Sequence, residues 1–246
     1  MLLLLPPSET KRDGGADDRA LDVSSLGFPE LAPQRRTALA ALARLSRSVS
    51  ASMAGLGLGP NQRAEVDRNR AIRSAPVMEV LDRYTGVLYD GVDVASLRPA
   101  ARAFAGRHVA VHSALFGLLR ADDRIPVYRL SHDSRLPGVS LRALWRAPIG
   151  AALGAQAGLT IDLRSESYAT LGPAPEAAWR VRVVAEDASG RRLALSHFNK
   201  AAKGEFVRAV LDSEIDHATV ESLLEWALDG GIQLERTAPS ELDLVV

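Results

Sequence analysis

Short continuous hydrophobic runs and stretches of helical spacing follow one another along the chain, and this pattern predicts a mixed α/β fold. Four leucines at residues 2–5 end at a double proline, as in a buried strand. Residues 35–52 carry apolar side chains at 39, 42, 45 and 49, the spacing of an amphipathic helix. We expect a single domain over residues 1–246, a mixed β-sheet flanked by helices, with a helical region at about residues 35–75.

The remaining elements follow from the same two periodicities and from the positions of glycine and proline. We predict a helix from Pro76 toward Tyr84. Pro148 is expected to kink or break the helix predicted at residues 141–153. The other predicted helices are residues 61–72, 99–106, 141–153, 201–211 and 219–228. The predicted strands are residues 109–112, 159–163, 179–186, 192–196, 232–236 and 242–246, with a hairpin across residues 187–190.

Composition limits the class of protein. Of the 246 residues, 47% are hydrophobic and 24% are charged, as in a globular protein with a sizeable core. The chain has no cysteine, which excludes disulfides, zinc–thiolate sites and peroxide chemistry on a thiol. The leading leucines lack the basic leader of a signal peptide, and no hydrophobic run is long enough to span a bilayer. We therefore expect a cytoplasmic protein with no membrane association.

Charge is distributed unevenly, although the formal net charge is zero. Residues 34–73 hold eight arginines against two acids, a local balance of +6. Residues 212–246 hold nine acids against one arginine, a local balance of −8. The asymmetry predicts a basic contact face and a separate acidic end, and the alternative is a pair of solvated helix faces.

The first candidate site is a glycine-rich turn between two predicted helices. Gly57 and Gly59 flank one leucine, which resembles the turn of a helix-hairpin-helix motif. Glycine permits close backbone approach, so N–H groups at the start of the second helix can hold a phosphate. Asn61, Gln62 and Arg63 would add contacts in its first turn. The alternative is a flexible connector.

A charged stretch at residues 113–130 is the second candidate. An apolar turn continues there into alternating charges that include Arg120 and Arg129. These arginines can pair with neighbouring acids or bind an anion. Taken alone, the residues favour structural ion pairs.

The third and fourth candidates are polar segments beside predicted secondary structure. Ser165, Glu166 and Tyr168 follow a strand, where α/β folds place ligand groups, and Ser165 can alternatively cap a helix. Lys200 and Lys203 share one face near a helix start, away from the end that the helix dipole favours for cations. The lysines therefore indicate an anionic partner, and Glu166 with the two lysines are the candidate catalytic residues.

The histidines do not predict a metal site. His108 and His112 share one side of either a helix or a strand, and His132, Asp133 or His197 would have to complete the ligands. No known metal spacing is present, and neither is a Walker loop, a dinucleotide fingerprint or a nucleophile elbow. We expect neither a metal nor a cofactor.

Five segments together resemble the YaaA family, which is named for peroxide stress, over nearly the whole chain. They are residues 6–11, 84–91, 113–130, 162–168 and 200–204, of which 113–130 is the most specific. Lys203 stands where an arginine is usual and Asp162 where an asparagine is usual. Phe116 replaces a common tyrosine, so that hydroxyl is missing here.

The resemblance implies a mixed α/β fold with a helix-hairpin-helix element, a positively charged cleft and binding of double-stranded DNA. It also implies a part in the response to hydroperoxide that limits iron-dependent oxidative damage. Our leading hypothesis is a monomeric, cytosolic DNA-binding protein with weak sequence preference. The alternative is an enzyme that acts on a nucleic acid or nucleobase through Glu166 and a lysine. A third hypothesis is iron sequestration.

Overall fold

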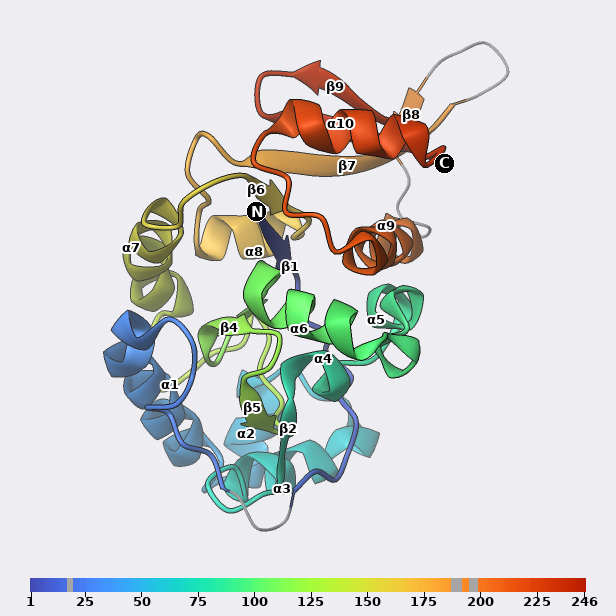
Figure 1. The fold of residues 1–246 in the computed structure, drawn as a ribbon. Helices are drawn as coiled ribbons and strands as arrows, with labels where there is room; N and C mark the ends of the chain where they lie inside the picture. Colours follow the sequence, from blue (N-terminus) through green and yellow to red (C-terminus); the bar gives the residue numbers. More distant parts are fainter. Residues whose placement is uncertain (17–19, 187–191, 195–198) are drawn as a thin grey trace.

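The protein is described by a computed structural model for residues 1–16, 20–186, 192–194 and 199–246. It confirms the mixed α/β fold, with one large sheet and a two-stranded sheet flanked by helices (Figure 1). The strands are β1 (Leu2–Leu5), β2 (Val77–Glu79), β3 (Val109–Ser113), β4 (Gly117–Arg120), β5 (Arg124–Pro126), β6 (Thr160–Asp162), β7 (Trp179–Glu186), β8 (Arg192–Ala194), β9 (Leu234–Ala238) and β10 (Glu241–Val245).

The helices alternate with these strands along the chain. The α-helices are α1 (Ala32–Leu45), α2 (Val49–Gly55), α3 (Ala64–Arg70), α4 (Val80–Arg83), α5 (Val87–Val92), α6 (Pro99–His108), α7 (Leu141–Gly154), α8 (Glu166–Leu171), α9 (Asn199–Ser213) and α10 (Val220–Asp229). Three single 3-10 turns are η1 (Pro29–Leu31), η2 (Pro60–Gln62) and η3 (Val94–Ser96).

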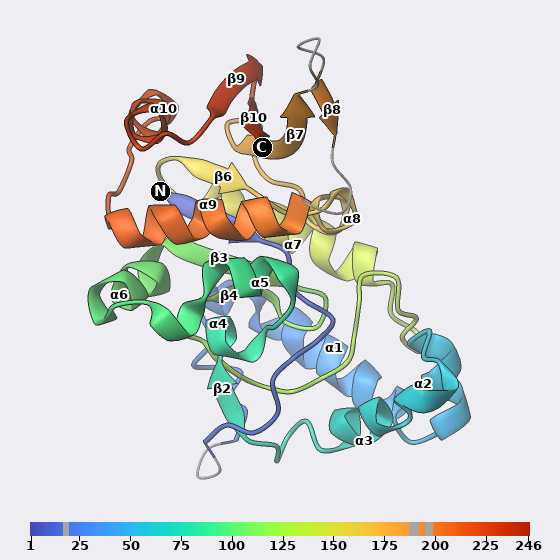
Figure 2. The ribbon, with the colours of Figure 1, turned by 90° about the vertical axis from the view of Figure 1, so that its right-hand side faces the viewer.

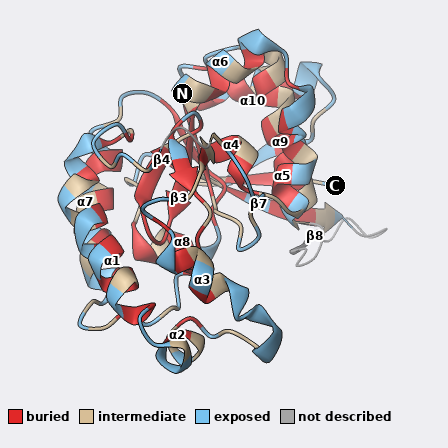
Figure 3. Ribbon diagram, turned by 90° about the horizontal axis from the view of Figure 1, so that it is seen from below, coloured by how far each residue is buried: buried red, intermediate tan, exposed pale blue. Residues whose placement is uncertain are grey.

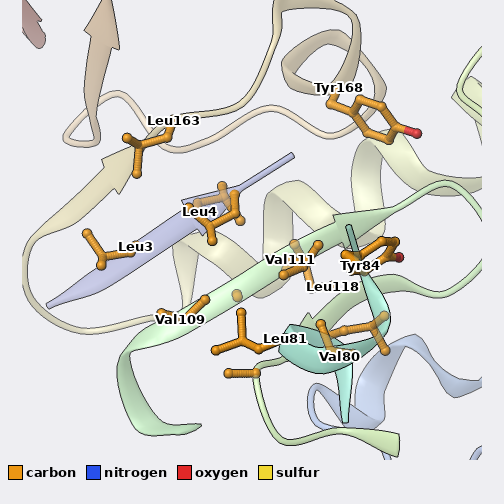
Figure 4. Close-up of a cluster of buried hydrophobic side chains, with 14 of the residues drawn as sticks. Leu3, Leu4, Val80, Leu81, Tyr84, Val109, Val111, Leu118, Leu163 and Tyr168 are labelled. Atoms are coloured by element: carbon orange, nitrogen blue, oxygen red, sulfur yellow. The ribbon is translucent and has the colours of Figure 1, made fainter. Parts of the chain in front are cut away.

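Strand β1 lies inside the large sheet, whose order is β4-β3-β1-β6-β7-β10-β9, with β8 paired to β7. Both neighbours of β1 run parallel to it. Figure 3 shows that buried residues follow the strands in the middle of the fold, whereas exposed residues lie on the outer helices. Leu3 and Leu4 of β1 are fully buried, in one cluster with Val109 and Val111 of β3 and with Leu163 after β6 (Figure 4). A parallel strand covered on both faces needs a continuous hydrophobic run, which is why the opening leucines form an inner strand. The carboxyl ends of β1, β3 and β6 therefore meet at one edge.

Helices cover both faces of the large sheet. Helices α5, α6 and α9 lie on one face, and α1 and α7 lie on the other (Figures 1 and 2). Helices α2 and α3 lie at one end of the molecule, whereas α10, β9 and β10 lie at the opposite end (Figure 1). The arginine-rich and acid-rich parts of the sequence are thus far apart in the fold.

Most predicted elements are confirmed, with shifts of a few residues at their ends. Strand β7 has the predicted bounds, and β8 pairs with it in antiparallel fashion. The predicted hairpin turn at 187–190 and residues 195–196 of its second strand lie outside the described residues. Helix α7 continues through Pro148 from Leu141 to Gly154, so the alternative of a break there is wrong.

The helical region differs from the prediction in three places. The helix predicted at 35–52 is two helices, because Ser48 leaves the helical conformation and caps α2 by accepting a hydrogen bond from the Ala51 N–H (3.3 Å). The helix predicted from residue 61 begins at Ala64, after a 3-10 turn. The segment after Pro76 is first a strand, because β2 pairs with β5, and only then a helix.

Candidate functional site

A pocket opens where β1 and β6 end, at the sheet edge where α/β proteins bind ligands. Its volume is about 470 Å³. The walls come from the loop after β1, the start of α5, the loop after β6 with α8, and the start of α9. The lining residues are Pro6, Pro7, Ser8, Glu9, Thr10, Thr85, Gly86, Val87, Leu88, Tyr89, His132, Leu163, Ser165, Tyr168, Asn199, Lys200 and Lys203. We call it the strand-end pocket.

Two glycines let α5 and α9 approach closely and so set the position of the pocket lysines. A Cβ atom on Gly204 would overlap the carbonyl oxygen of Leu88, and one on Gly91 would lie 3.0 Å from the carbonyl oxygen of Ala201. Only glycine permits this backbone contact. The contact places the first turn of α9, with Lys200 and Lys203, against the start of α5.

Lys203 is a buried cation in the pocket wall. Its side chain is 7% exposed, and its Nζ donates a hydrogen bond to the carbonyl oxygen of Leu163 at 3.0 Å. Burial lowers the pKa of Lys203 to about 8, against the opposing effect of Asp162 and with a smaller lowering by Arg180. Lys203 is therefore still mostly protonated at neutral pH.

Lys11 lies behind the pocket wall formed by the loop after β1. Its Nζ donates hydrogen bonds to the carbonyl oxygens of Ser8 (3.0 Å) and Glu9 (3.3 Å). It also lies 4.3 Å from the ring centre of Tyr128, a cation–π contact. Desolvation, followed by the charge of Arg129, lowers the pKa of Lys11 to about 7. The lysine thus ties the loop to the core.

A directed chain of three hydroxyl groups lies beneath the same loop. Ser113 Oγ accepts hydrogen bonds from the N–H groups of Leu115 (3.1 Å) and Phe116 (3.0 Å). Both acceptor positions of Ser113 are then occupied, so it donates to the Tyr128 hydroxyl (2.7 Å), which donates to that of Tyr84 (2.7 Å). Burial raises the pKa of Tyr128 to about 12. The chain is neutral at physiological pH, and Lys11 lies over the rings of its two tyrosines.

Beside the pocket, Arg164 is the centre of a closed polar network. It is 2% exposed and donates to both carboxylate oxygens of Asp162, at 2.9 and 2.7 Å. It also donates to His112 Nδ1 (2.8 Å) and to the carbonyl oxygen of Gly172 (2.6 Å). Burial, reinforced by Arg164, lowers the pKa of His112 well below its usual value. The network fixes the loop from which α8 starts.

The structure brings together only part of the predicted site. Ser165, Tyr168, Lys200 and Lys203 line the strand-end pocket. Ser165 occupies the N-cap position of α8, but its side chain makes no capping hydrogen bond. Arg129 lies at the pocket edge, where it pairs with the lining residue Glu9 at 2.7 Å.

Two predicted residues point elsewhere. Glu166 pairs with Arg180 at 2.5 Å and lines a separate shallow depression. Arg120 donates to Gln156 Oε1 (2.9 Å) and lies over the ring of Phe28. Arg120 and Glu166 therefore do not join Lys200 and Lys203 in the strand-end pocket, because these two side chains have local partners.

The glycine turn lies apart from the strand-end pocket, between α2 and α3. Gly57 has a left-handed backbone with φ of 63°. The N–H of Gly59 donates to Gln62 Oε1 at 2.9 Å, so Gln62 caps the turn. Asn61 and Arg63 are exposed in the first residues after it.

The histidines do not converge. His108 Nδ1 bonds the carbonyl oxygen of Met1 (2.8 Å), whereas His112 belongs to the Arg164 network. His132 is exposed at the pocket and lies against Tyr168, and His197 lies outside the described residues. Among the described residues, no group of three or more histidine or acidic side chains is arranged to hold a metal ion.

Sequence reasoning did not select Lys11, the hydroxyl chain or the Arg164 network. One signal for Lys11 was available. The chain has only three lysines, Lys11, Lys200 and Lys203, against 27 arginines. All three lie in or directly behind the wall of the strand-end pocket.

Fold and site together define an α/β protein with a cationic pocket at the carboxyl ends of its inner strands. None of the helices in the described part of the chain has the length and apolar character to cross a membrane. A family model described as "Peroxide stress protein YaaA" matches residues 1–232. The chain therefore belongs to the YaaA family of peroxide stress proteins.

Bacterial relatives match over nearly their whole length. The chain is 41% identical over 240 residues to a UPF0246 protein of Corynebacterium efficiens, covering 96% of this chain and 95% of the relative. It is 42% identical over 241 residues to one of Corynebacterium glutamicum, with 96% and 95% covered. It is 39% identical over 246 residues to one of Streptomyces coelicolor, with 98% and 94% covered.

Proposed function

We propose that this protein serves in the response to peroxide by binding double-stranded DNA at the end formed by α1, α2 and α3. Membership of the peroxide stress family supports the first part. The observation that carries the second part is a set of exposed arginines with no acidic partner within 4.0 Å among the described residues. This set, the arginine face, is Arg36, Arg44, Arg47, Arg63 and Arg73.

The other arginines of the basic block have structural roles. Arg35 is fully buried and donates to the carbonyl oxygens of Phe116 and Leu118. Arg68 pairs with Asp13 and Glu65, and Arg70 pairs with Asp67. The +6 balance of the sequence thus reduces to the five arginines of the arginine face. Arg44 also donates to the carbonyl oxygen of Pro137 (2.9 Å), an uncharged partner that leaves its charge available for phosphates.

The glycine turn also supports DNA binding, but through the side chains that follow it and not through its backbone N–H groups. The N–H of Gly59 is already satisfied by Gln62. Asn61 and Arg63 are exposed beside it and are suited to phosphate contacts. Binding through phosphates predicts weak sequence preference and a steep dependence on salt.

Fluorescence anisotropy with a labelled duplex at several salt concentrations tests DNA binding. The variant Arg47→Ala/Arg63→Ala/Arg73→Ala should bind more weakly. It should also lower the slope of log affinity against log salt by about 2–3, since each phosphate contact contributes about 0.9. The control is Arg98→Ala/Arg182→Ala/Arg236→Ala, which removes the same charge from arginines that pair with Glu214, Glu241 and Glu221.

Equal losses of DNA affinity in the two triple variants would show that net charge, and not the arginine face, drives the binding. No salt dependence in the wild-type protein would overturn the proposal altogether. Protection of the covered DNA is the proposed link to iron-dependent damage. Nicking of a supercoiled plasmid by ferrous iron and peroxide should fall with the wild-type protein and fall less with the arginine-face variant.

The alternative of an enzyme with a Glu166–lysine site receives no support. Glu166 faces Arg180 and a different depression from the one that Lys200 and Lys203 line. A general acid must lie within hydrogen-bonding reach of the group that it protonates. The two halves of that site are therefore not assembled.

A further inference from the structure

The charge of Lys203 is not compensated within the described part of the chain. Cations that are almost fully buried are normally paired with a carboxylate. Lys203 is 7% exposed, and its one hydrogen-bond partner there is the uncharged carbonyl oxygen of Leu163. No carboxylate of the described residues lies within 4.0 Å of its Nζ. The protein therefore carries an uncompensated positive charge in the pocket wall.

The nearby carboxylates are already engaged. Asp162 gives both of its oxygens to Arg164. Glu9, which lines the pocket, pairs with Arg129 at 2.7 Å. The charged groups that face Lys203 from the adjoining strands are Asp162 and the like-charged Arg180. Among the residues that the structure describes, both acids near the ammonium group are thus engaged by arginines.

Lys200 adds to the positive charge of the same pocket, and Lys11 braces its wall. Lys200 lies one helical turn before Lys203 and is exposed at the pocket. Lys11 supports the opposite wall through the carbonyl oxygens of Ser8 and Glu9. The pocket thus has Lys200 and Lys203 on its α9 side, and its carboxylate Glu9 is paired with Arg129.

The remaining lining indicates what kind of anion fits. Four hydroxyl-bearing residues, Ser8, Thr10, Thr85 and Ser165, line the pocket together with proline, valine and leucine residues. A volume of about 470 Å³ is that of a site for a small organic molecule. A duplex does not fit into such a volume, and Lys203 is too buried for a backbone phosphate on a duplex to reach.

We propose that the strand-end pocket binds a small organic anion, with a phosphate or carboxylate group against Lys203 and Lys200 and an uncharged body against Pro6, Pro7, Val87 and Leu88. The anion is the missing counterion of Lys203. The hydroxyl groups and the tyrosines orient its body. The site is separate from the arginine face, so it goes beyond DNA binding and does not depend on it.

Titration calorimetry on the full-length protein tests the proposal with adenosine 5′-monophosphate, benzoate and inorganic phosphate. Adenosine and benzyl alcohol are the matched uncharged probes. At least one organic anion should bind, and its uncharged counterpart should bind at least about tenfold more weakly, because a charge-assisted hydrogen bond is lost. The anion whose affinity exceeds that of its own uncharged counterpart by the larger factor identifies phosphate or carboxylate as the group that is recognised.

Variants at position 203 separate a ligand role from a structural one. Lys203→Met should weaken anion binding by about 10- to 100-fold, and its melting temperature should rise, because an uncompensated buried charge is removed. Lys203→Arg keeps the charge and should retain more affinity than Lys203→Met. Arg142→Met, which removes an exposed cation outside the pocket, is the control and should leave anion binding unchanged.

Several results would overturn the proposal. One is that none of the three anions binds at millimolar concentration. Another is that Lys203→Met binds them as tightly as the wild-type protein does. A lower melting temperature of Lys203→Met, together with unchanged binding, would make Lys203 a structural residue. If duplex DNA is the sole ligand and Lys203→Met abolishes its binding, the pocket belongs to the DNA site and the small-anion proposal fails.

Discussion

Two buried cations beside the end of β6 have opposite surroundings. Arg164 is 2% exposed and is held by both oxygens of Asp162, by His112 and by the carbonyl oxygen of Gly172. Lys203 is 7% exposed and has one carbonyl partner among the described residues. The first charge is compensated within the fold, whereas the second is not.

This difference separates residues that hold the pocket in shape from residues that bind its ligand. A buried ion pair is costly to break, because removing one partner leaves the other charge unpaired in a low-dielectric environment. An unpaired buried cation lowers stability and persists only where another function requires it. We therefore assign Arg164 to the architecture of the pocket and Lys203 to its ligand.

The largest expected effect is on the Arg164 network. Arg164→Met removes the guanidinium charge from the buried carboxylate of Asp162, which keeps a hydrogen bond from the backbone N–H of residue 164 (3.0 Å). The free energy of unfolding should fall by about 3–5 kcal/mol. Guanidinium unfolding followed by circular dichroism measures this loss. In the double variant Arg164→Met/Asp162→Leu both charges are removed, and much of the loss should be recovered. A loss below about 1 kcal/mol in the single variant would remove the contrast with Lys203.

The second effect has the opposite sign and depends on pH. The pKa of Lys203 is about 8 in the folded protein and returns to its ordinary value of about 10.4 on unfolding. Between these values the unfolded state binds more protons, so wild-type stability rises with pH. The advantage of Lys203→Met should be of the order of 3 kcal/mol below pH 8 and should disappear as pH approaches 10.4.

Unfolding curves of Lys203→Met and the wild-type protein between pH 6 and 10.5 measure this advantage. Asp162 and Arg180 face Lys203 and are present in both proteins. The buried tyrosines titrate at high pH in both proteins, so their contribution cancels in the difference. A difference that does not change with pH would mean that the charge of Lys203 carries no energetic cost.

A smaller effect is expected at the glycine contact that places Lys203. In Gly204→Ala the new Cβ overlaps the carbonyl oxygen of Leu88, so α9 must move away from α5. We expect a loss of about 1–3 kcal/mol from overpacking, offset by about 1 kcal/mol of helix propensity. Anion binding should weaken, because Lys203 moves with the helix. Gly154→Ala, in α7 with open space around its Cβ, is the control and should not lose stability or affinity.

The sequence predicted the parts of the fold that depend on local pattern. The leucines at 2–5 and the run at 109–112 are continuous hydrophobic segments, and both are buried parallel strands. The hairpin partners β7 and β8 were identified from alternation around a turn. The strand after Pro76 was missed, because its pairing with β5 joins residues about 47 positions apart and three residues carry too little periodicity.

The candidate site was predicted in part for a similar reason. Ser165, Tyr168, Lys200 and Lys203 were found because the first two follow a strand and the lysines oppose a helix dipole. Arg120 and Glu166 looked equally suited to an anion, but Gln156 and Arg180 engage them instead. Which partner a charged side chain contacts in the fold cannot be predicted from composition or spacing.

The sequence by itself determined the class of fold, the inner hydrophobic strands, the family and the uneven distribution of charge. Tertiary structure decided which charges are buried and which are compensated. It buried Arg35 among carbonyl oxygens and paired Asp162 with Arg164, and within the described residues it left Lys203 with one carbonyl oxygen. The physical reason is that desolvation and ion pairing depend on neighbours that are distant in sequence, such as Leu163 for Lys203. Local propensity carries no information about those neighbours.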